Sequence, residues 1–175
     1  RFRHLLAINR RLAAATDMHT VLEETMEAAV TMTASERGFL LLKSEDTKRH
    51  GLVVAIAKNM DKEVVKKAAA KFSRGIAERV VETGESVLTE DAGIDPQLHR
   101  SRSVHAMKLR SVLSVPIRSE TGVVGAIYLD NRFRPKAFDQ DAVELVTALA
   151  DQAGIALERT RLLRELETRT QELER

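Results

Sequence analysis

Residues 111–131 have the sequence SVLSVPIRSETGVVGAIYLDN, and they predict the centre of the fold. Two apolar runs, residues 111–118 and 123–130, are joined by the polar residues 119–122, which end in a glycine. Because glycine adopts the positive φ angle that a tight turn needs, the stretch predicts an antiparallel β-hairpin. Pro116 cannot donate a hydrogen bond within a sheet, so we expect either a bulge in this strand or a neighbour that needs no bond there.

Short apolar runs outside the hairpin predict the rest of the sheet. Three of them lack a helical period: residues 38–43, 51–57 and 86–89. Consecutive apolar positions indicate strands that are covered on both faces, so helices or long connections must lie on each side of the sheet. Apolar residues at helical spacing predict the helices: residues 2–15, 17–35, 73–84 and 139–175, with a Lys-rich helix opening at Asp61. This order predicts an α+β fold with a mainly antiparallel sheet of five to six strands.

The composition excludes several classes of protein. With 43% hydrophobic and 31% charged residues among 175, the chain has the content of one globular domain. It has no cysteine, which excludes disulfides, thiolate metal sites, cysteine nucleophiles and thioether-linked bilins. A net charge of +2, five phenylalanines, one tyrosine and no tryptophan disfavour direct binding to nucleic acid. No apolar run approaches the roughly 18 residues of a membrane span, so we expect a soluble, cytoplasmic protein without a membrane partner.

The last 37 or so residues, 139–175, contain one glycine and no proline, and they predict an exceptionally long helix. The second half of this helix is so polar that it needs a partner helix, which predicts a homodimer. The predicted interface residues lie on a heptad seam, broken by Gln152 and Arg159, and on the N-terminal helix: Leu149, Ala156, Leu163, Leu166 and Leu173, with Leu5 and Leu12. Because the chain starts without Met and ends inside a charged heptad, we expect it to be part of a longer protein whose effector domain follows.

Five pieces of the sequence, in this order, resemble a GAF domain. They are SERGFLLL at 35–42, RSVLSVPI at 110–117, TGVVGAIYLDN at 121–131, Phe138 with Asp141, and LVTALADQAGIAL at 145–157. The resemblance covers residues 18–160, and SRGIA at 73–77 with TGESVL at 83–88 also fits it. It is strongest to the GAF modules of bacterial transcriptional activators, sensor kinases and nucleotide cyclases.

The resemblance implies a PAS-related architecture and a regulatory function. The N- and C-terminal helices would cover one face of the antiparallel sheet, and the middle helices with the long loop at 90–110 would cover the other and hold a small ligand. The implied organisation is an N-terminal linker or dimerisation helix at 1–17, the GAF domain at 18–157, and a signalling helix or coiled coil at 158–175. The family implies signal transduction by a non-catalytic sensor, and a transcription regulator is one of the effectors it implies.

Side chains on the central hairpin are candidates for ligand contacts. Counting back from the turn places Val112 and Ser114 on one face with Ile127, and Tyr128 on the other, although a slip of one residue would exchange the faces. Ser114 is a hydroxyl among apolar neighbours, so it bonds either a ligand or nearby backbone. Tyr128 carries the same two alternatives.

Cationic residues before the hairpin are the second group of candidates. No acidic residue occurs between Asp95 and Glu120, whereas His105 and Arg110 lie in this stretch, and Arg74 lies at the start of a helix. An anionic ligand could use these groups, although a solvated loop has the same composition. The pattern around Asn131 and Phe138 departs from that of cyclic-nucleotide-binding members, so no cyclic nucleotide is assigned.

Two functions therefore stay open: a sensor with a small ligand of unknown identity, and a ligand-free scaffold that serves dimerisation and spacing. The five histidines lack metal-ligand spacing, so no metal is expected, and a haem on His99 or His105 is disfavoured against a solvent-facing imidazole. One enzymatic branch of the fold reduces methionine sulfoxide, but that chemistry needs a cysteine that this chain does not have.

Overall fold

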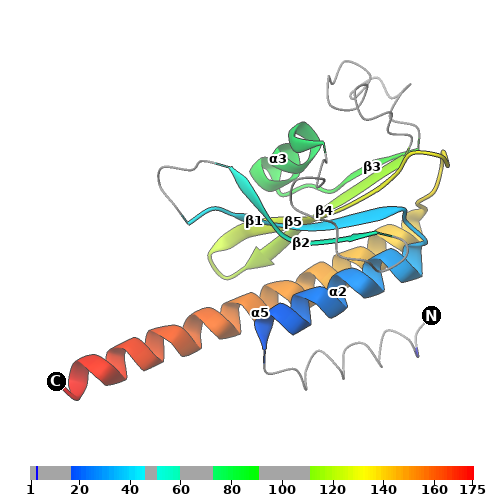
Figure 1. Ribbon diagram of the computed structural model, residues 1–175. Helices are drawn as coiled ribbons and strands as arrows, with labels where there is room; N and C mark the ends of the chain where they lie inside the picture. The colour runs from blue at the N-terminus through cyan, green and yellow to red at the C-terminus, as the bar shows by residue number, and fades with distance from the viewer. Residues whose placement is uncertain (1–2, 4–16, 46–50, 60–72, 91–110) are drawn as a thin grey trace.

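The computed structural model describes Arg3 and residues 17–45, 51–59, 73–90 and 111–175 (Figure 1). The predicted helices at 2–15 and from Asp61, and nearly all of the connection at 90–110, lie outside the described residues. So do four of the predicted site residues: Leu5, Leu12, His105 and Arg110.

A five-stranded antiparallel sheet forms the middle layer, in the order β2-β1-β5-β4-β3. Its strands are β1 (Arg37–Lys43), β2 (Leu52–Asn59), β3 (Val87–Thr89), β4 (Ser111–Ser119) and β5 (Gly122–Asn131). The predicted hairpin is therefore confirmed as β4 and β5, with β5 in the centre of the sheet. Pro116 lies beyond the part of β4 that pairs with β3, so its missing N–H leaves no gap in that ladder.

Helices cover both faces of the sheet, as the consecutive apolar residues predict (Figure 1). Helices α2 (Met18–Thr33) and α5 (Gln140–Leu173) lie side by side on one face, and α3 (Arg74–Thr83) lies on the other. The side chain of Asp17 caps α2, and that of Asp139 caps α5 by accepting the Ala142 N–H at 2.8 Å. Among the described helices, none is both long and apolar enough to cross a lipid bilayer.

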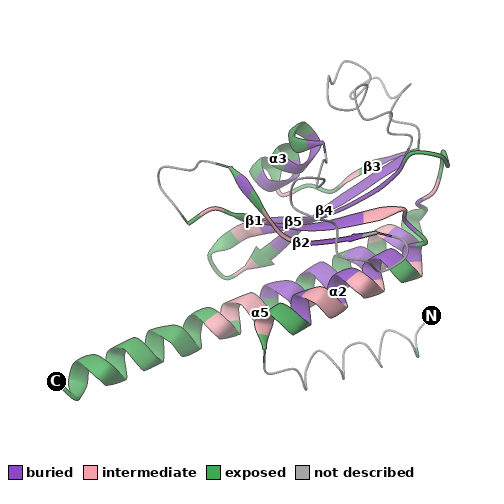
Figure 2. Ribbon diagram, in the orientation of Figure 1, coloured by how far each residue is buried: buried purple, intermediate pink, exposed green. Residues whose placement is uncertain are grey.

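The sheet separates two hydrophobic cores. The larger core lies under α2 and α5, and its fully buried members include Met26, Leu40, Leu113, Ile127 and Leu149. The smaller core lies under α3 and includes Phe39, Leu41, Ile76, Val112 and Tyr128. Figure 2 shows buried residues along the strands of the sheet and on parts of α2, α3 and the first half of α5.

The face predicted for Ile127 is wrong. The pairing of β4 with β5 shifts by one residue between Ile117 and Arg118, so Ser114 lies opposite Tyr128 and Val115 lies opposite Ile127. This bulge next to the turn exchanges the faces that result from counting back through a regular hairpin. Ile127 therefore points into the α2–α5 core, whereas Val112, Ser114 and Tyr128 share the α3 face of the sheet.

Candidate functional site

A buried ion pair joins β1 to the central strand β5 on the α3 face of the sheet. Arg37 on β1 lies opposite Asp130 on β5, and its guanidinium donates two hydrogen bonds to the carboxylate, of 2.9 and 2.6 Å. The Asp130 side chain is fully buried and that of Arg37 is 11% exposed. The Arg37 guanidinium also lies 5.3 Å from the ring centre of Phe39. Two parallel hydrogen bonds of this kind fix the orientation of both groups.

Tyr128 extends this pair to α3. Its ring packs against Phe39 with 5.9 Å between centroids, and its hydroxyl donates a hydrogen bond to Asp130. The same hydroxyl accepts the backbone N–H of Ser73 at 3.2 Å. Ser73 is the N-cap residue of α3. We call these four residues, Arg37, Asp130, Tyr128 and Ser73, the Asp130 network, which ties the first turn of α3 to the middle of the sheet.

Burial dominates the ionisation of the Asp130 network. Burial raises the pKa of Tyr128 well above its ordinary value, and the neighbouring charge of Asp130 raises it further. Burial also raises the pKa of Asp130, while the hydrogen bonds from Arg37 and Tyr128 act in the opposite direction. At neutral pH the tyrosine is therefore a neutral hydrogen-bond donor. These groups hold structure in place and offer no exposed acid, base or nucleophile.

Two of the candidate ligand residues, Ser114 and Tyr128, are engaged within the protein. The Ser114 hydroxyl donates to the backbone carbonyl of Ile127 at 3.1 Å, and Tyr128 belongs to the Asp130 network. Ser114, Tyr128 and Val112 all have 0% exposure. Sequence reasoning missed Arg37 and Asp130, although each is a charged residue at the end of an otherwise apolar strand and thus carries a signal of burial with a partner.

Arg74 lies at the first position of α3 and is exposed. Its guanidinium donates a hydrogen bond of 3.3 Å to the backbone carbonyl of Leu52 on β2. The structure therefore brings Arg74 to the same side of the sheet as Ser114 and Tyr128. The Arg74 side chain is exposed at the surface, whereas Ser114 and Tyr128 contribute hydroxyl groups that are buried in the core.

A second polar junction, absent from the sequence analysis, is centred on Ser111 at the start of β4. The fully buried hydroxyl lies 2.6 Å from the carbonyl oxygen of Arg134 and 3.2 Å from that of Glu90, and it accepts the Ala137 N–H at 3.1 Å. The Lys136 N–H also donates to the Glu90 carbonyl, at 2.7 Å. We call these contacts the Ser111 junction. They join the end of β3 and the start of β4 to the loop that leads into α5.

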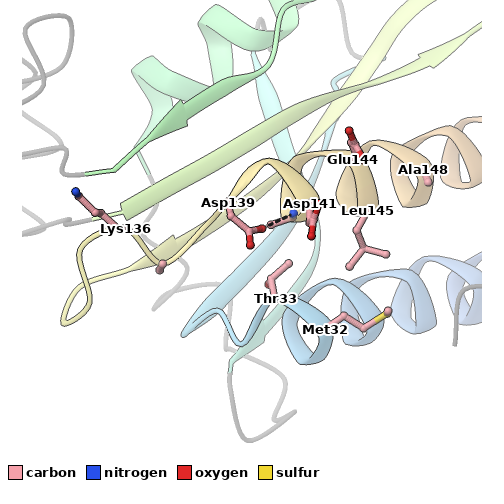
Figure 3. A pocket seen from close by; sticks show the side chains of 10 residues that line it. Met32, Thr33, Lys136, Asp139, Asp141, Glu144, Leu145 and Ala148 are labelled. Atoms are coloured by element: carbon pink, nitrogen blue, oxygen red, sulfur yellow. Dashed lines mark hydrogen bonds between the residues drawn. The ribbon is translucent and has the colours of Figure 1, made fainter. Parts of the chain in front are cut away.

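A cleft of about 430 Å³ opens beside this loop, between the last turn of α2 and the first turns of α5 (Figure 3). Met32 of α2 and Leu145 of α5 contribute apolar walls, while Asp139, Asp141 and Glu144 make one side acidic. The Asp139 carboxylate serves as the cap of α5 (Figure 3). No group of three His, Cys, Asp or Glu side chains suited to a metal ion occurs among the residues that the structure describes.

The second half of α5 projects from the domain with its side chains exposed (Figure 2). Of the predicted interface residues, Leu163 and Leu166 are 52% and 60% exposed and Leu173 is 88% exposed. Leu149 is fully buried against the sheet within its own chain, so it belongs to the domain core. Ile155 and Leu162, which the sequence analysis did not select, are 62% and 44% exposed.

A comparison with protein families finds one family whose model covers most of this chain. A GAF domain model matches residues 15–158, which is most of the chain. The chain belongs to the GAF domain family. GAF domains are commonly regulatory sensors in signalling proteins, and the resemblance of the sequence to this family is confirmed.

Solved structures show the same fold at low sequence identity. The GAF domain of an Acinetobacter phosphoenolpyruvate-protein phosphotransferase has a TM-score of 0.72 and 16% identity, over 92% of this chain and 94% of that chain. A methyl-accepting chemotaxis protein segment, residues 122–287, has a TM-score of 0.66 and 23% identity, over 89% and 98%. The free methionine-R-sulfoxide reductase of Neisseria meningitidis has a TM-score of 0.71 and 21% identity, over 91% and 89%. The GAF fold of this chain thus occurs in signalling proteins and in an enzyme.

Proposed function

We propose that this GAF domain is a non-catalytic regulatory sensor that binds a small ligand on the α3 side of its sheet. The ligand biases the position of α5, and the projecting half of α5 pairs with that of a second copy and passes the change to an effector domain outside this chain. The observation that carries the proposal is α5 itself. Its first half is buried against the sheet, and the same continuous helix then projects with leucines exposed.

The Ser111 junction supports a route from the ligand side to α5. Glu90 and Ser111 are the described residues on either side of the connection that the family resemblance assigns to the ligand. Both are hydrogen-bonded to residues 134–137, Glu90 through the Lys136 N–H and Ser111 through Arg134 and Ala137, and these residues lead into the Asp139 cap of α5. A ligand that prefers one arrangement of this junction by about 1–3 kcal/mol supplies a typical allosteric coupling.

A specific observation favours a second function, that of a ligand-free scaffold for dimerisation and spacing. Ser114 and Tyr128 are fully buried and bonded to the protein's own groups. If the rest of this face is filled in the same way, α5 serves only as a spacer between a partner and an effector.

One experiment distinguishes the two functions. The protein is purified gently, examined by native mass spectrometry, and heated with cyclic nucleotides, amino acids or haem. The sensor predicts either a retained small molecule or a rise in melting temperature with one of these compounds, because binding to the folded state stabilises it. No retained mass and no stabilisation by any compound would favour the scaffold.

Self-association is tested separately. Deletion of residues 158–175 removes Leu163, Leu166 and Leu173, so we expect weaker self-association by light scattering. A protein that is monomeric both before and after the deletion would contradict the dimer.

A further inference from the structure

We propose that two copies of α5 pair in parallel along one particular seam, an inference that rests on the homodimer of the proposed function. The seam consists of Ile155, Arg159, Leu162, Leu166, Arg169 and Leu173. These residues follow one another at alternating spacings of four and three, which is the heptad pattern of a two-stranded coiled coil. The seam shares Arg159, Leu166 and Leu173 with the one predicted from sequence. Ile155 and Leu162 take the places of Ala156 and Leu163.

The burial of α5 selects this seam. Leu149, Ala153 and Gly154 are buried against the sheet, so the side of the helix that continues from Leu149 through Ala156 faces the domain. Ile155 is 62% exposed within this docked part of the helix. The stripe that starts at Ile155 runs on through Leu162, which is 44% exposed, to Leu166 and Leu173. A partner helix can therefore contact this stripe along its whole length without displacing the core.

The exposed leucines on the projecting half of α5 indicate that a partner covers them. The part of α5 from Arg161 to Leu173 extends for about 20 Å at roughly 1.5 Å per residue. An isolated helix of this length is marginal in water, and one with a leucine seam is stabilised by burying that seam in a partner. A second copy of this chain supplies the same seam with the same heptad phase.

The flanking charges favour the parallel orientation. Glu158, Glu165 and Glu172 all lie on one flank of the seam, each one residue before Arg159, Leu166 or Leu173. In a parallel pair Glu158 and Glu165 face Leu163 and Thr170 of the partner copy, five residues further along, so that no carboxylate faces another carboxylate. In an antiparallel pair the three glutamates would face the same three glutamates, which is destabilising.

Contacts within α5 do not remove this preference. Arg161 contacts Glu158 and Glu165, each at 2.6 Å, from the side of the flank that is away from the seam, and the Glu158 side chain is only 12% exposed. The preference for the parallel pair therefore rests mainly on Glu165 and Glu172, which are exposed. One arginine thus serves two carboxylates, and Glu172 adds a third on the same flank. The arginines of the seam meet arginines in either orientation, so they lower the stability of the pair without choosing its direction. Polar seam residues fix register at a cost in stability, which suits a helix that must shift.

Cysteine crosslinking tests both the seam and the direction, because the chain has no native cysteine. Three single variants, Leu162→Cys, Leu166→Cys and Leu173→Cys, are oxidised mildly and analysed on non-reducing gels. In a parallel pair each seam cysteine lies next to the same cysteine of the partner copy. We therefore expect disulfide-linked dimers to form at least about tenfold faster than in Gln171→Cys, which lies on the side of α5 opposite the seam. All four positions are exposed in the single chain, and circular dichroism checks that each variant is folded.

Three outcomes would overturn the proposal. Crosslinking of Leu163→Cys in place of Leu162→Cys would assign the seam that runs through Ala156. Crosslinking of Ile155→Cys with Leu173→Cys in a mixture, without crosslinking of Leu173→Cys alone, would make the pair antiparallel. Both results leave the homodimer of the proposed function intact. A monomer by light scattering with no crosslinks would overturn the homodimer as well and would assign the stripe to a different partner, while ligand retention would still test the sensor.

Discussion

Gly154 of α5 lies so close to the backbone carbonyl oxygen of Arg118 that a Cβ atom at this position would overlap the oxygen. The same Cβ would lie 3.6 Å from the side chain of Ile117 on β4. This contact is where the long helix meets the end of the central hairpin. It sets the distance between α5 and the sheet and thereby the position from which the exposed half of the helix projects.

Gly154→Ala is expected to destabilise the domain, although alanine is the better helix former. The substitution gains about 1 kcal/mol of helix propensity, but the clash with backbone forces α5 away from β4 at a cost of about 1–3 kcal/mol or more. Urea unfolding measures the net change. Gly75→Ala on α3 is the matched control, because a Cβ there has nothing within 4 Å, and we expect it to be neutral or stabilising. Equal effects at both positions would contradict the close contact.

Tyr128→Phe removes the hydroxyl that joins the two ends of the Asp130 network. The ring contact with Phe39 remains, while the Ser73 N–H loses its acceptor and Asp130 loses a donor. A buried group left without its partner costs about 1–3 kcal/mol, so we expect a loss of stability of this order. Hydrogen exchange should accelerate at the Ser73 amide and in the first turn of α3, and exchange in α2 should stay unchanged. If the Ser73 amide exchanged no faster in Tyr128→Phe than in the unmodified protein, the hydrogen bond to the Tyr128 hydroxyl would not stabilise the start of α3.

The ionisation of Tyr128 gives a pH-dependent test. The folded pKa lies well above the ordinary value of 10.0, so the folded state keeps the phenol proton where the unfolded chain loses it. Its contribution to stability is therefore fully present below about pH 10 and is lost as pH rises toward the folded pKa. Because the chain has one tyrosine and no tryptophan, tyrosinate absorbance reports this group alone. The native protein should show no tyrosinate at pH 10, where the urea-unfolded chain is about half ionised, and equal titration curves would refute the buried environment.

The sequence predicts the elements well where local chemistry decides them. The apolar runs with a glycine turn correctly predict β4 and β5, and the helix predicted over residues 17–35 is confirmed as α2. The side-chain face fails at Ile127 because a one-residue bulge depends on how the hairpin meets its neighbours. Leu149 fits a heptad seam equally well, and only the packing of α5 on the sheet shows that this side chain is already buried.

The candidate site was less accessible from the sequence. Arg37 and Asp130 are 93 residues apart in the chain, and their pairing follows from the register of β1 with β5. The Ser111 junction consists of contacts between one hydroxyl and backbone groups, so residue identities elsewhere carry no signal of it. Long-range register and backbone contacts of this kind become visible only when the fold is known.

Ser111→Ala tests whether this junction links the two sides of the domain. Alanine fits the buried position but leaves the Ala137 N–H without its acceptor, at a cost of about 1–3 kcal/mol. If the junction holds the loop that leads into α5, exchange should accelerate together at Ala137 and Lys136 and at the amides of the first turn of α5. Ser119→Ala at the other end of β4 is the matched control, because among the described residues its hydroxyl forms hydrogen bonds only with Thr121, two residues further along the turn. Faster exchange at Ala137 with an unchanged first turn of α5 would mean that Ser111 only fixes the loop locally, and the proposed route from the α3 side to α5 would then need other contacts.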